Sequence, residues 1–248
     1  MFDFPWPTLL AAALIVLLSY SVYGLTGFGA AIVGIPLMAH FFPLRFAVPM
    51  MLVFDLCAGL MFGLRDRKHI SRSELLWLAP FVLTGMAIGL VLLIKVNERW
   101  LLMVLGSFVL LYALRNLLNK NTPRPISKRW AVPAGVIGGS LTSMYGTGGP
   151  LYVLYLAGRI VDKSTLRASL GILIFSTALV RLGLFTTSGF YAQPSLLPLA
   201  FALAPMAFLG YWLGSRLHTR LPPERASQAV YLLLIGGGAS LLWRSIHM

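Results

Sequence analysis

Long apolar runs separated by short polar gaps extend along the whole chain. Most of the runs suit a membrane-spanning helix, which needs roughly 20 apolar residues at about 1.5 Å rise per residue. The runs at 28–42 and 149–158 are shorter, and each follows a glycine-rich break. The pattern therefore predicts an all-α integral membrane protein in which each short run is one arm of a helical hairpin. The other runs lie at about 8–24, 46–64, 75–94, 100–118, 130–145, 165–187, 195–215 and 226–243.

The glycine-rich break occurs twice, as Gly24-Leu-Thr-Gly-Phe-Gly29 and as Ser143-Met-Tyr-Gly-Thr-Gly-Gly149. Gly27 and Gly146, which correspond when the breaks are aligned, are 119 positions apart. Two such breaks at matching positions indicate a transporter built from an internal repeat. The expected organisation is a first transmembrane repeat at 1–118, a cytoplasmic basic linker at 119–129 and a second transmembrane repeat at 130–248.

Composition supports the membrane assignment. Hydrophobic residues make up 58% of the 248 positions and charged residues only 11%. A single soluble core of this size has no room for so much apolar surface. The net charge of +13 would suggest nucleic-acid binding in a soluble protein. Here the basic residues lie in short gaps between apolar runs, so they indicate topology and no nucleic-acid partner is expected.

Basic residues are concentrated in four gaps, which hold 15 of the 20. Short loops rich in Lys and Arg stay in the cytoplasm, so these four gaps are predicted to lie inside. The gap at 186–194 has no charge, and Lys95 and Arg99 are offset by Glu98, so both of these gaps are predicted to lie outside. The four basic gaps carry Arg65, Arg67, Lys68 and Arg72; Arg115, Lys120, Arg124, Lys128 and Arg129; Arg159, Lys163 and Arg167; and Arg216, Arg220 and Arg225.

The two repeats are predicted to have inverted topology. The gap after the third run of the first repeat lies inside, and its counterpart at 186–194 lies outside. Each repeat is then one hairpin plus three full crossings, which is an odd number of passages if the hairpin enters and leaves on one side. The total is about eight spans, or seven to ten depending on how the hairpins are counted, with both termini external.

The breaks are candidate substrate sites, because non-helical backbone at membrane depth is tolerated only where it is buried or lines a watery cavity. New helices start around Ala30 and Pro150, and the partial positive charge of a helix N-terminus favours an anion. If the hairpins enter from opposite faces, their tips meet near the midplane. Tight packing of small residues is the alternative, and the matching positions favour a site. The candidate residues are Gly24, Thr26, Gly27, Phe28, Gly29, Ala30, Thr142, Ser143, Tyr145, Gly146, Thr147, Gly148 and Gly149.

Two charged residues in the apolar runs are not part of the four basic gaps. Asp55 is near the middle of the run at 46–64. Such acids mark ion or proton paths, so Asp55 is a candidate coupling group, with pairing to a donor on a neighbouring helix as the alternative. Arg181 is near the predicted outer end of the run at 165–187. Snorkelling to the interface is the favoured interpretation of Arg181, and contact with the anion is the alternative.

The residue set gives no sign of an enzyme. No nucleophile with a paired base, phosphate-binding loop or redox pair can be assembled, and Cys57 is the single cysteine. His40, His69, His218 and His247 are scattered without other ligands at metal-site spacing, so neither a metal nor a cofactor is expected. The prediction is a secondary transporter of a small anion. A channel-like permease and a membrane assembly subunit remain alternatives.

The two breaks also carry a family resemblance. Gly24-Leu-Thr-Gly-Phe-Gly-Ala-Ala-Ile-Val-Gly-Ile-Pro36 and Gly146-Thr-Gly-Gly-Pro-Leu-Tyr-Val-Leu-Tyr-Leu156 resemble the paired signatures of the TauE/SafE sulfite exporter or anion permease family. The resemblance implies movement of sulfite, a sulfonate or sulfoacetate across a bacterial inner membrane. Ala30 and Ala31 replace part of the family's glycine run. The sequence leaves open the anion, the direction of transport, the coupling ion or proton and a homo-oligomeric state.

Overall fold

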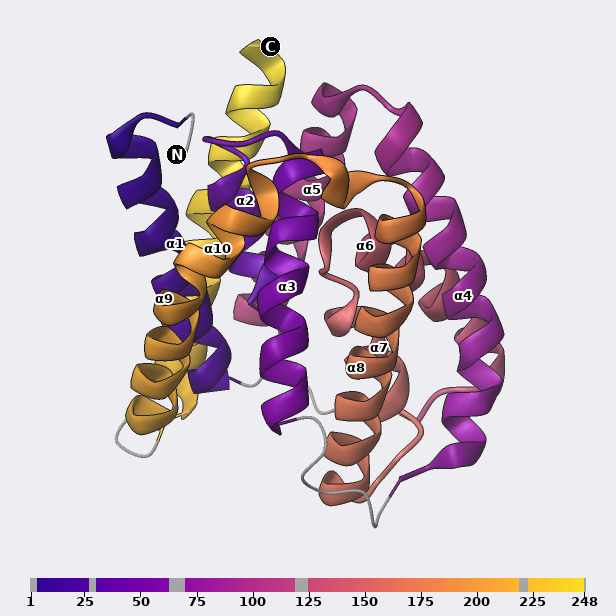
Figure 1. Cartoon of the computed structure of the whole chain (residues 1–248). Helices are drawn as coiled ribbons and strands as arrows, with labels where there is room; N and C mark the ends of the chain where they lie inside the picture. The colour runs from indigo at the N-terminus through magenta and orange to yellow at the C-terminus, as the bar shows by residue number, and fades with distance from the viewer. Residues whose placement is uncertain (1–3, 27–29, 63–69, 119–124, 219–222, 248) are drawn as a thin grey trace. The chain divides into compact units, whose positions relative to one another are not determined.

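The computed structural model describes residues 4–26, 30–62, 70–118, 125–218 and 223–247. Within these ranges the regular secondary structure consists of α-helices and short 3-10 turns, and there is no strand (Figure 1). The α-helices are α1 Trp6–Thr26, α2 Ala31–Met38, α3 Leu44–Phe62, α4 Arg72–Lys95, α5 Glu98–Leu118, α6 Ala131–Tyr145, α7 Gly149–Ala157, α8 Lys163–Thr187, α9 Leu196–His218 and α10 Pro223–His247. Short 3-10 turns lie at Lys128–Trp130 and Phe190–Ala192. The all-helical prediction is confirmed for these residues.

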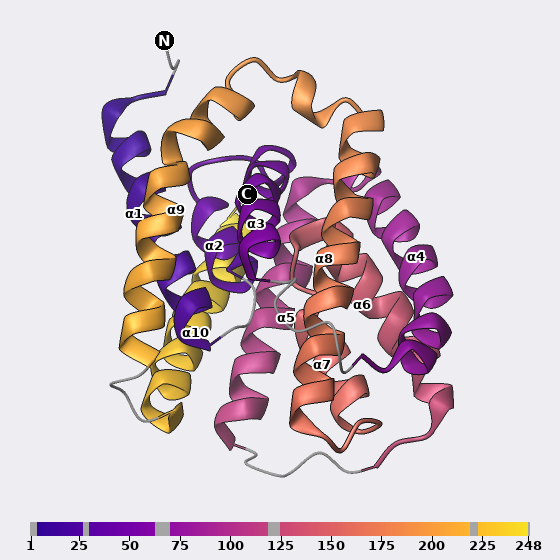
Figure 2. The same cartoon turned by 60° about the horizontal axis from the view of Figure 1, so that its bottom comes forward.

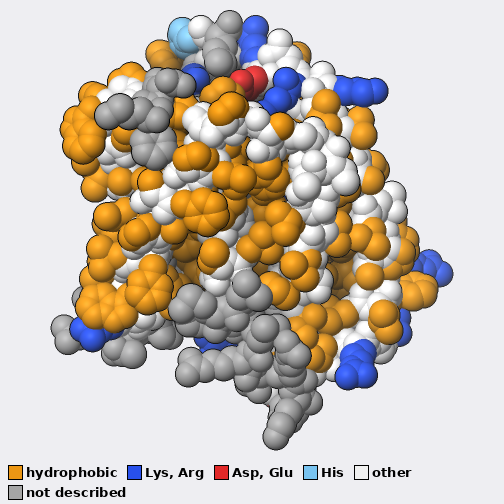
Figure 3. All heavy atoms as spheres, viewed as in Figure 1, with side chains coloured by type: hydrophobic (Ala, Val, Ile, Leu, Met, Phe, Trp, Pro, Cys, Tyr) orange, Lys and Arg blue, Asp and Glu red, His pale blue; other side chains and the backbone are white. Residues whose placement is uncertain are grey.

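Six helices in the described ranges, α1, α4, α5, α8, α9 and α10, are long and apolar enough to cross a membrane. Their large apolar side chains point outward, for example Leu76, Leu111 and Phe201, which are 74%, 67% and 68% exposed. Figure 3 shows apolar side chains over most of the visible face, with Lys and Arg gathered toward its edges. Such a surface is stable in lipid and would aggregate in water.

The short helices occupy the predicted positions. α2 and α7 are 8 and 9 residues long, and each follows a glycine-rich break. They begin at Ala31 and Gly149, within one residue of the expected starts at Ala30 and Pro150. The prediction of short arms after both breaks is therefore confirmed. The number of crossings and the inverted orientation stay predictions.

The chain divides into two compact units. Unit 1 comprises Met1–Met51, Val96–Lys120 and Phe190–Met248, and unit 2 comprises Leu52–Lys95 and Asn121–Gly189. Each unit therefore combines helices from both of the repeats expected from the sequence.

In unit 2, α4 and α6 pack with their backbones in contact. A Cβ atom on Gly85 would clash with the carbonyl oxygen of Val136, and one on Gly89 would clash with that of Ser140. The Ser140 hydroxyl also donates to the Gly85 carbonyl at 3.0 Å. Glycine permits this close approach, which strengthens van der Waals packing between membrane helices.

In unit 1, α1 and α9 pack in the same way (Figure 2). A Cβ atom on Gly210 would clash with the carbonyl oxygen of Leu17, and one on Gly214 would clash with that of Ser21. Gly24 is likewise held against the Tyr211 carbonyl oxygen. α5 packs against α10 in the same unit.

These two helix pairs have the same register. The contacting glycines of α9 follow those of α4 by 125 positions, as Gly85 to Gly210 shows. The residues whose carbonyls they meet are 119 positions apart, as Leu17 and Val136 show, and this is also the spacing of the two glycine-rich breaks. The same packing is therefore built twice, each time from one helix of each half.

Three segments predicted to lie inside meet at one end of unit 2. Arg159, after α7, donates through Nη2 to the Glu74 carboxylate at 2.8 Å, near the start of α4. The Ile126 N–H donates to the Gly158 carbonyl at 3.1 Å, and the Trp77 indole N–H donates to the Lys128 carbonyl at 3.3 Å. The end of the linker therefore lies with the α7–α8 gap and the start of α4. The side of the membrane that they face stays a prediction.

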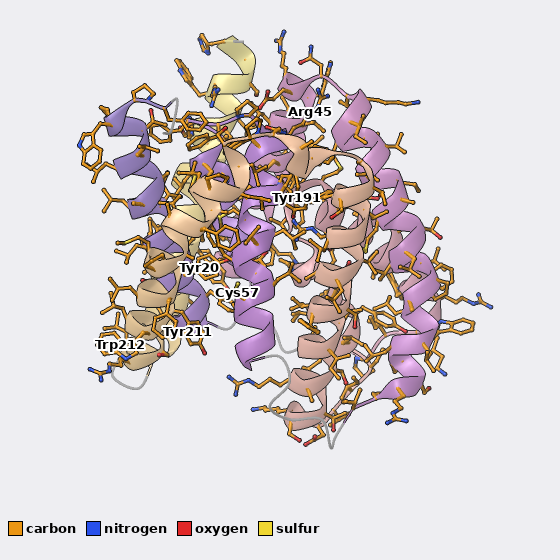
Figure 4. All side chains as sticks on the ribbon, viewed as in Figure 1. Tyr20, Arg45, Cys57, Tyr191, Tyr211 and Trp212 are labelled. Carbon is orange, nitrogen blue, oxygen red and sulfur yellow. The ribbon has the colours of Figure 1, made fainter. Side chains whose placement is uncertain are left out.

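The two gaps predicted to lie outside each contact the start of α3. The Glu98 carboxylate accepts the Leu44 N–H at 2.9 Å, and Arg45 donates to the Val96 carbonyl at 3.1 Å. The Tyr191 hydroxyl donates to the Pro49 carbonyl at 3.2 Å, which joins the gap before α9 to the first turns of α3 (Figure 4). Both gaps therefore lie near the first turns of α3, and the side of the membrane that they face stays a prediction.

Candidate functional site

The second glycine-rich break ends α6 in a left-handed turn. Gly146 follows the last helical residue and has φ of +71°, a conformation that side chains other than hydrogen disfavour. Its N–H donates to the Thr142 carbonyl at 2.8 Å, and the Thr147 N–H donates to the Leu141 carbonyl at 3.4 Å. The turn therefore satisfies the last carbonyls of α6 and redirects the chain into α7.

Gly148 and Gly149 have different surroundings. A Cβ atom on Gly148 would clash with the Thr142 hydroxyl and with the Gly138 carbonyl oxygen, so this residue is packed tightly against α6. A Cβ atom on Gly149 would meet no atom of the described residues within 4 Å. The break is thus packed against α6 at Gly148, whereas the space beside Gly149, the first residue of α7, is open.

Three buried hydroxyl-bearing side chains flank the break. Thr142 donates to the Gly138 carbonyl at 2.8 Å, and its oxygen is 2.8 Å from the Tyr152 hydroxyl of α7. Ser143 and Thr147 are 0% and 2% exposed, and their hydroxyls have no hydrogen-bond partner in the part of the chain that the structure describes. Leaving a buried hydroxyl without a partner costs about 1–3 kcal/mol. These two donors are therefore placed where a ligand would satisfy them.

The first turn of α7 adds backbone donors. The N–H groups of Leu151 and Tyr152 donate to the Gly148 carbonyl at 3.1 and 3.3 Å. The N–H groups of Gly148 and Gly149 precede them at the helix start, where backbone donors have no partner within the helix. Pro150 suits the first turn because it has no N–H to leave unsatisfied. The start of α7 thus has the partial positive charge and the donors that bind anions.

Arg181 is buried, with only 3% of the residue exposed. Its Nη1 lies 3.8 Å from Asp55 Oδ2, and its guanidinium carbon lies 5.6 Å from the centre of the Phe185 ring. The interpretation of Arg181 as a snorkelling anchor is wrong, because the side chain points into unit 2 and ends at an acid of another helix. For Asp55 the predicted alternative, pairing with a donor on a neighbouring helix, is confirmed. Proton coupling through Asp55 stays a prediction.

Tyr152 connects Arg181 to the break, and the sequence analysis missed it. Tyr152 is buried, with 1% of the residue exposed. Its hydroxyl contacts Thr142 and interacts electrostatically with Arg181. In the sequence Tyr152 belongs to the short apolar arm and looks like a core aromatic residue. The sequence feature that could have indicated a functional role is the presence of two tyrosines, Tyr152 and Tyr155, in an arm too short to cross the membrane.

The first break is described only at its margins. Gly27, Phe28, Gly29 and the side chain of Thr26 lie outside the described residues. Gly24 is explained by contact with the α9 backbone, which is the helix-packing alternative. Ala30 is fully buried, and its carbonyl accepts the Gly34 N–H at 2.8 Å, next to the first turn of α2. The candidate residues that the structure brings together are therefore those of the second break, including Tyr145, which is 0% exposed.

Comparisons with known proteins agree with the helical membrane architecture. A family model described as Sulfite exporter TauE/SafE matches residues 12–241. The Probable inner membrane transporter protein TsaS of Comamonas testosteroni is 26% identical over 199 residues, which cover 79% of this chain and 83% of that protein. No solved structure matches the chain.

Proposed function

This chain belongs to the Sulfite exporter TauE/SafE family, and on that premise we propose that it is a secondary transporter of a small sulfur-containing anion. Sulfite, a sulfonate and sulfoacetate are the substrates to test first. The membrane is a bacterial inner membrane, as the description of the relative TsaS indicates for that protein. Topology, with about eight crossings and external termini, is proposed from the charge pattern of the gaps.

The observation that carries the proposal is the pair of buried hydroxyls, Ser143 and Thr147, which have no partner among the described residues and flank the start of α7. The oxygens of sulfite or of a sulfonate group accept hydrogen bonds and share negative charge. Hydroxyl donors next to a helix N-terminus match both properties. The open space at Gly149 gives an anion room beside these donors.

The repeated register of α1 with α9 and of α4 with α6 supports a transport cycle based on two repeats. Inverted repeats move substrate by rocking or gating one part of the protein against another around a central site. The expectation from the sequence that the first break also binds substrate stays a prediction, because most of that break lies outside the described residues. Asp55 is the proposed proton-coupling group.

The test is uptake by the purified chain in lipid vesicles, with sulfite, sulfoacetate, sulfate and chloride as separate substrates. Together, Ser143→Ala and Thr147→Val should raise the half-saturating anion concentration by about thirtyfold, because each removes a donor worth roughly 1 kcal/mol. They should not lower the melting temperature, since neither hydroxyl has a protein partner in the described chain. Thr84→Val is the control, because the Thr84 hydroxyl is exposed and donates to its own helix at 2.8 Å.

Counterflow of labelled anion separates a carrier from a channel, because only a carrier concentrates label against an unlabelled pool. The proposal is wrong if the parent protein moves none of the four anions. It is also wrong if the Ser143 and Thr147 variants transport as well as the parent.

A further inference from the structure

We propose that Asp55 is an internal competitor of the transported anion for the Arg181 guanidinium. This inference rests on the proposed function and adds a mechanism of coupling to it. When no anion is bound, the Asp55 carboxylate pairs with Arg181. When an anion enters, it takes the place of the carboxylate, and Asp55 binds a proton from water on the side from which the anion enters.

The spacing of the ion pair supports exchange of partners. Arg181 Nη1 and Asp55 Oδ2 are 3.8 Å apart, which is a long separation for an ion pair. In the same unit, Arg159 and Glu74 form a close pair, with Nη2 and Nε at 2.8 and 3.2 Å from Oε1. The described part of unit 2 therefore contains a tight ion pair, Arg159 with Glu74, and a loose one, Arg181 with Asp55. Because the Asp55–Arg181 pair is loose, the guanidinium can form shorter and better-aligned hydrogen bonds with an incoming anion than it forms with Asp55.

Burial requires that Arg181 always have an anionic partner. The Arg181 side chain is 4% exposed and that of Asp55 is 20% exposed. A buried charge left without its counterion is strongly unfavourable, and more so within a membrane. Two anions beside one guanidinium would in turn leave a buried negative charge. The arrangement is therefore most stable with one charged partner at a time, either Asp55 or the substrate.

The internal repeat indicates that the Asp55–Arg181 pair lies near the bilayer centre. Asp55 and Arg181 are 126 positions apart, against 125 for Gly85 and Gly210, so they occupy nearly equivalent positions of α3 and α8. In an inverted repeat, residues that contact their own counterparts lie near the level where the two halves cross, at the bilayer centre. Substrate sites of such transporters lie at the same level.

The contacts also connect the pair to the second break. Among the described residues, the ionisable groups that these contacts place near Asp55 include Arg181 on α8 and, beyond it, Tyr152 on α7. Cys57, two residues along α3, is exposed. Tyr152 contacts Thr142 of the break and interacts electrostatically with Arg181, so in this proposal an anion at the break comes within reach of the guanidinium that Asp55 holds. Protonation of Asp55 then couples one proton to each anion bound, with no other bond made or broken.

The experiment is calorimetric titration of the purified protein with sulfite and with sulfoacetate at a series of pH values between about pH 5 and pH 8. Asp55→Asn removes the competitor and nearly preserves shape. We expect it to bind the anion at least about tenfold more tightly at the upper pH and to lose most of the pH dependence. Arg181→Gln and the double variant with Asp55→Asn should both lose anion binding, whereas Arg181→Lys should retain part of it.

Glu74→Gln is the matched control, because it breaks the other buried ion pair of unit 2 and should leave anion affinity unchanged. A purely structural ion pair gives a different result: each single neutralisation lowers the melting temperature, and the double variant regains both stability and transport. That result overturns the inference, as does unchanged affinity in Asp55→Asn when the parent transports. If the parent neither binds nor moves an anion, the proposed function itself fails.

Discussion

Gly106 of α5 and Gly238 of α10 contact each other reciprocally, because a Cβ atom on either residue would lie 3.0 Å from the carbonyl oxygen of the other. The neighbours are also matched: Gly106 faces Leu242, and Gly238 faces Leu110. A contact of this kind arises when two helices hold equivalent places in a repeat. Glycine-mediated backbone contact is thus common to three helix pairs, α1 with α9, α4 with α6 and α5 with α10.

The reciprocal contact predicts different effects at two glycines of the same helix. Gly238→Ala should give a less stable protein than Gly236→Ala, because the added methyl group lies 3.0 Å from the Gly106 carbonyl oxygen and the α5 backbone must shift by a few tenths of an ångström to accept it. Gly236→Ala should be neutral or slightly stabilising, since a Cβ atom there meets nothing within 4 Å and alanine favours helix. Thermal unfolding in detergent, followed by tryptophan fluorescence, measures both. Equal melting temperatures for the two variants would contradict the packing described for α5 and α10.

The second break predicts a separation of folding from transport at adjacent positions. Gly148→Ala should reduce the yield of folded protein, because its methyl group would clash with the Gly138 carbonyl oxygen and the Thr142 hydroxyl. Gly149→Ala should fold like the parent and transport more slowly, because its methyl group occupies open space beside the α7 N-terminus. Size-exclusion profiles and initial uptake rates in vesicles report the two effects. A Gly149→Ala protein with parental transport would show that the anion does not use this space.

The sequence predicted the fold well because its signals are local. Run length and glycine position set where α2 and α7 begin, and the charge of each gap predicted which segments meet at one end of a unit. The Glu74 and Arg159 contact shows this, since it joins two segments assigned to the same side. The pairing of helices was not predictable, because it depends on which face of each helix presents its small residues to a distant partner.

Arg181 shows the limit of the same reasoning. Its distance along the helix suggested a depth near the outer boundary, and snorkelling then followed if the side chain faced lipid. Exposure depends on the rotational position of the residue and on its neighbours, and Arg181 faces α3 at Asp55. Tyr152 was missed for a related reason: its role comes from Thr142, ten residues earlier, which only the turn at Gly146 brings opposite it.

The ion pair at the linker end of unit 2 predicts graded losses of stability. Glu74 accepts from Arg159 and from the Tyr155 hydroxyl, the latter at 2.9 Å. Tyr155→Phe removes one charge-assisted hydrogen bond and should cost about 1–2 kcal/mol. Glu74→Gln should cost about 2–4 kcal/mol, because it breaks a largely buried pair and leaves the arginine without its counterion. A double-mutant cycle in thermal or denaturant unfolding should show coupling between the two positions, and strict additivity would contradict the shared network.

His40 predicts a pH dependence at the end of unit 1 where α10 finishes. Partial burial and the nearby Arg244 charge lower the pKa of His40 below its ordinary value of 6.5. Its ring Nε2 lies 3.2 Å from the Ser240 hydroxyl, and Arg244 donates to the Ala39 carbonyl. Because the unfolded chain takes up this proton at a higher pH than the folded one, the contribution of His40 is complete above pH 6.5 and declines as the pH falls toward its lowered pKa.

The melting temperature of the parent should therefore fall more steeply than that of His40→Gln as the pH drops below about 6.5. Arg244→Gln should also reduce this difference, since it removes one of the two causes of the shift. His247→Gln, at an exposed position near the C-terminus, is the control for loss of a histidine as such. Parallel melting curves for the parent and His40→Gln down to about pH 5 would mean that His40 is charged in the folded protein, and that α10 does not hold the neutral ring against Arg244.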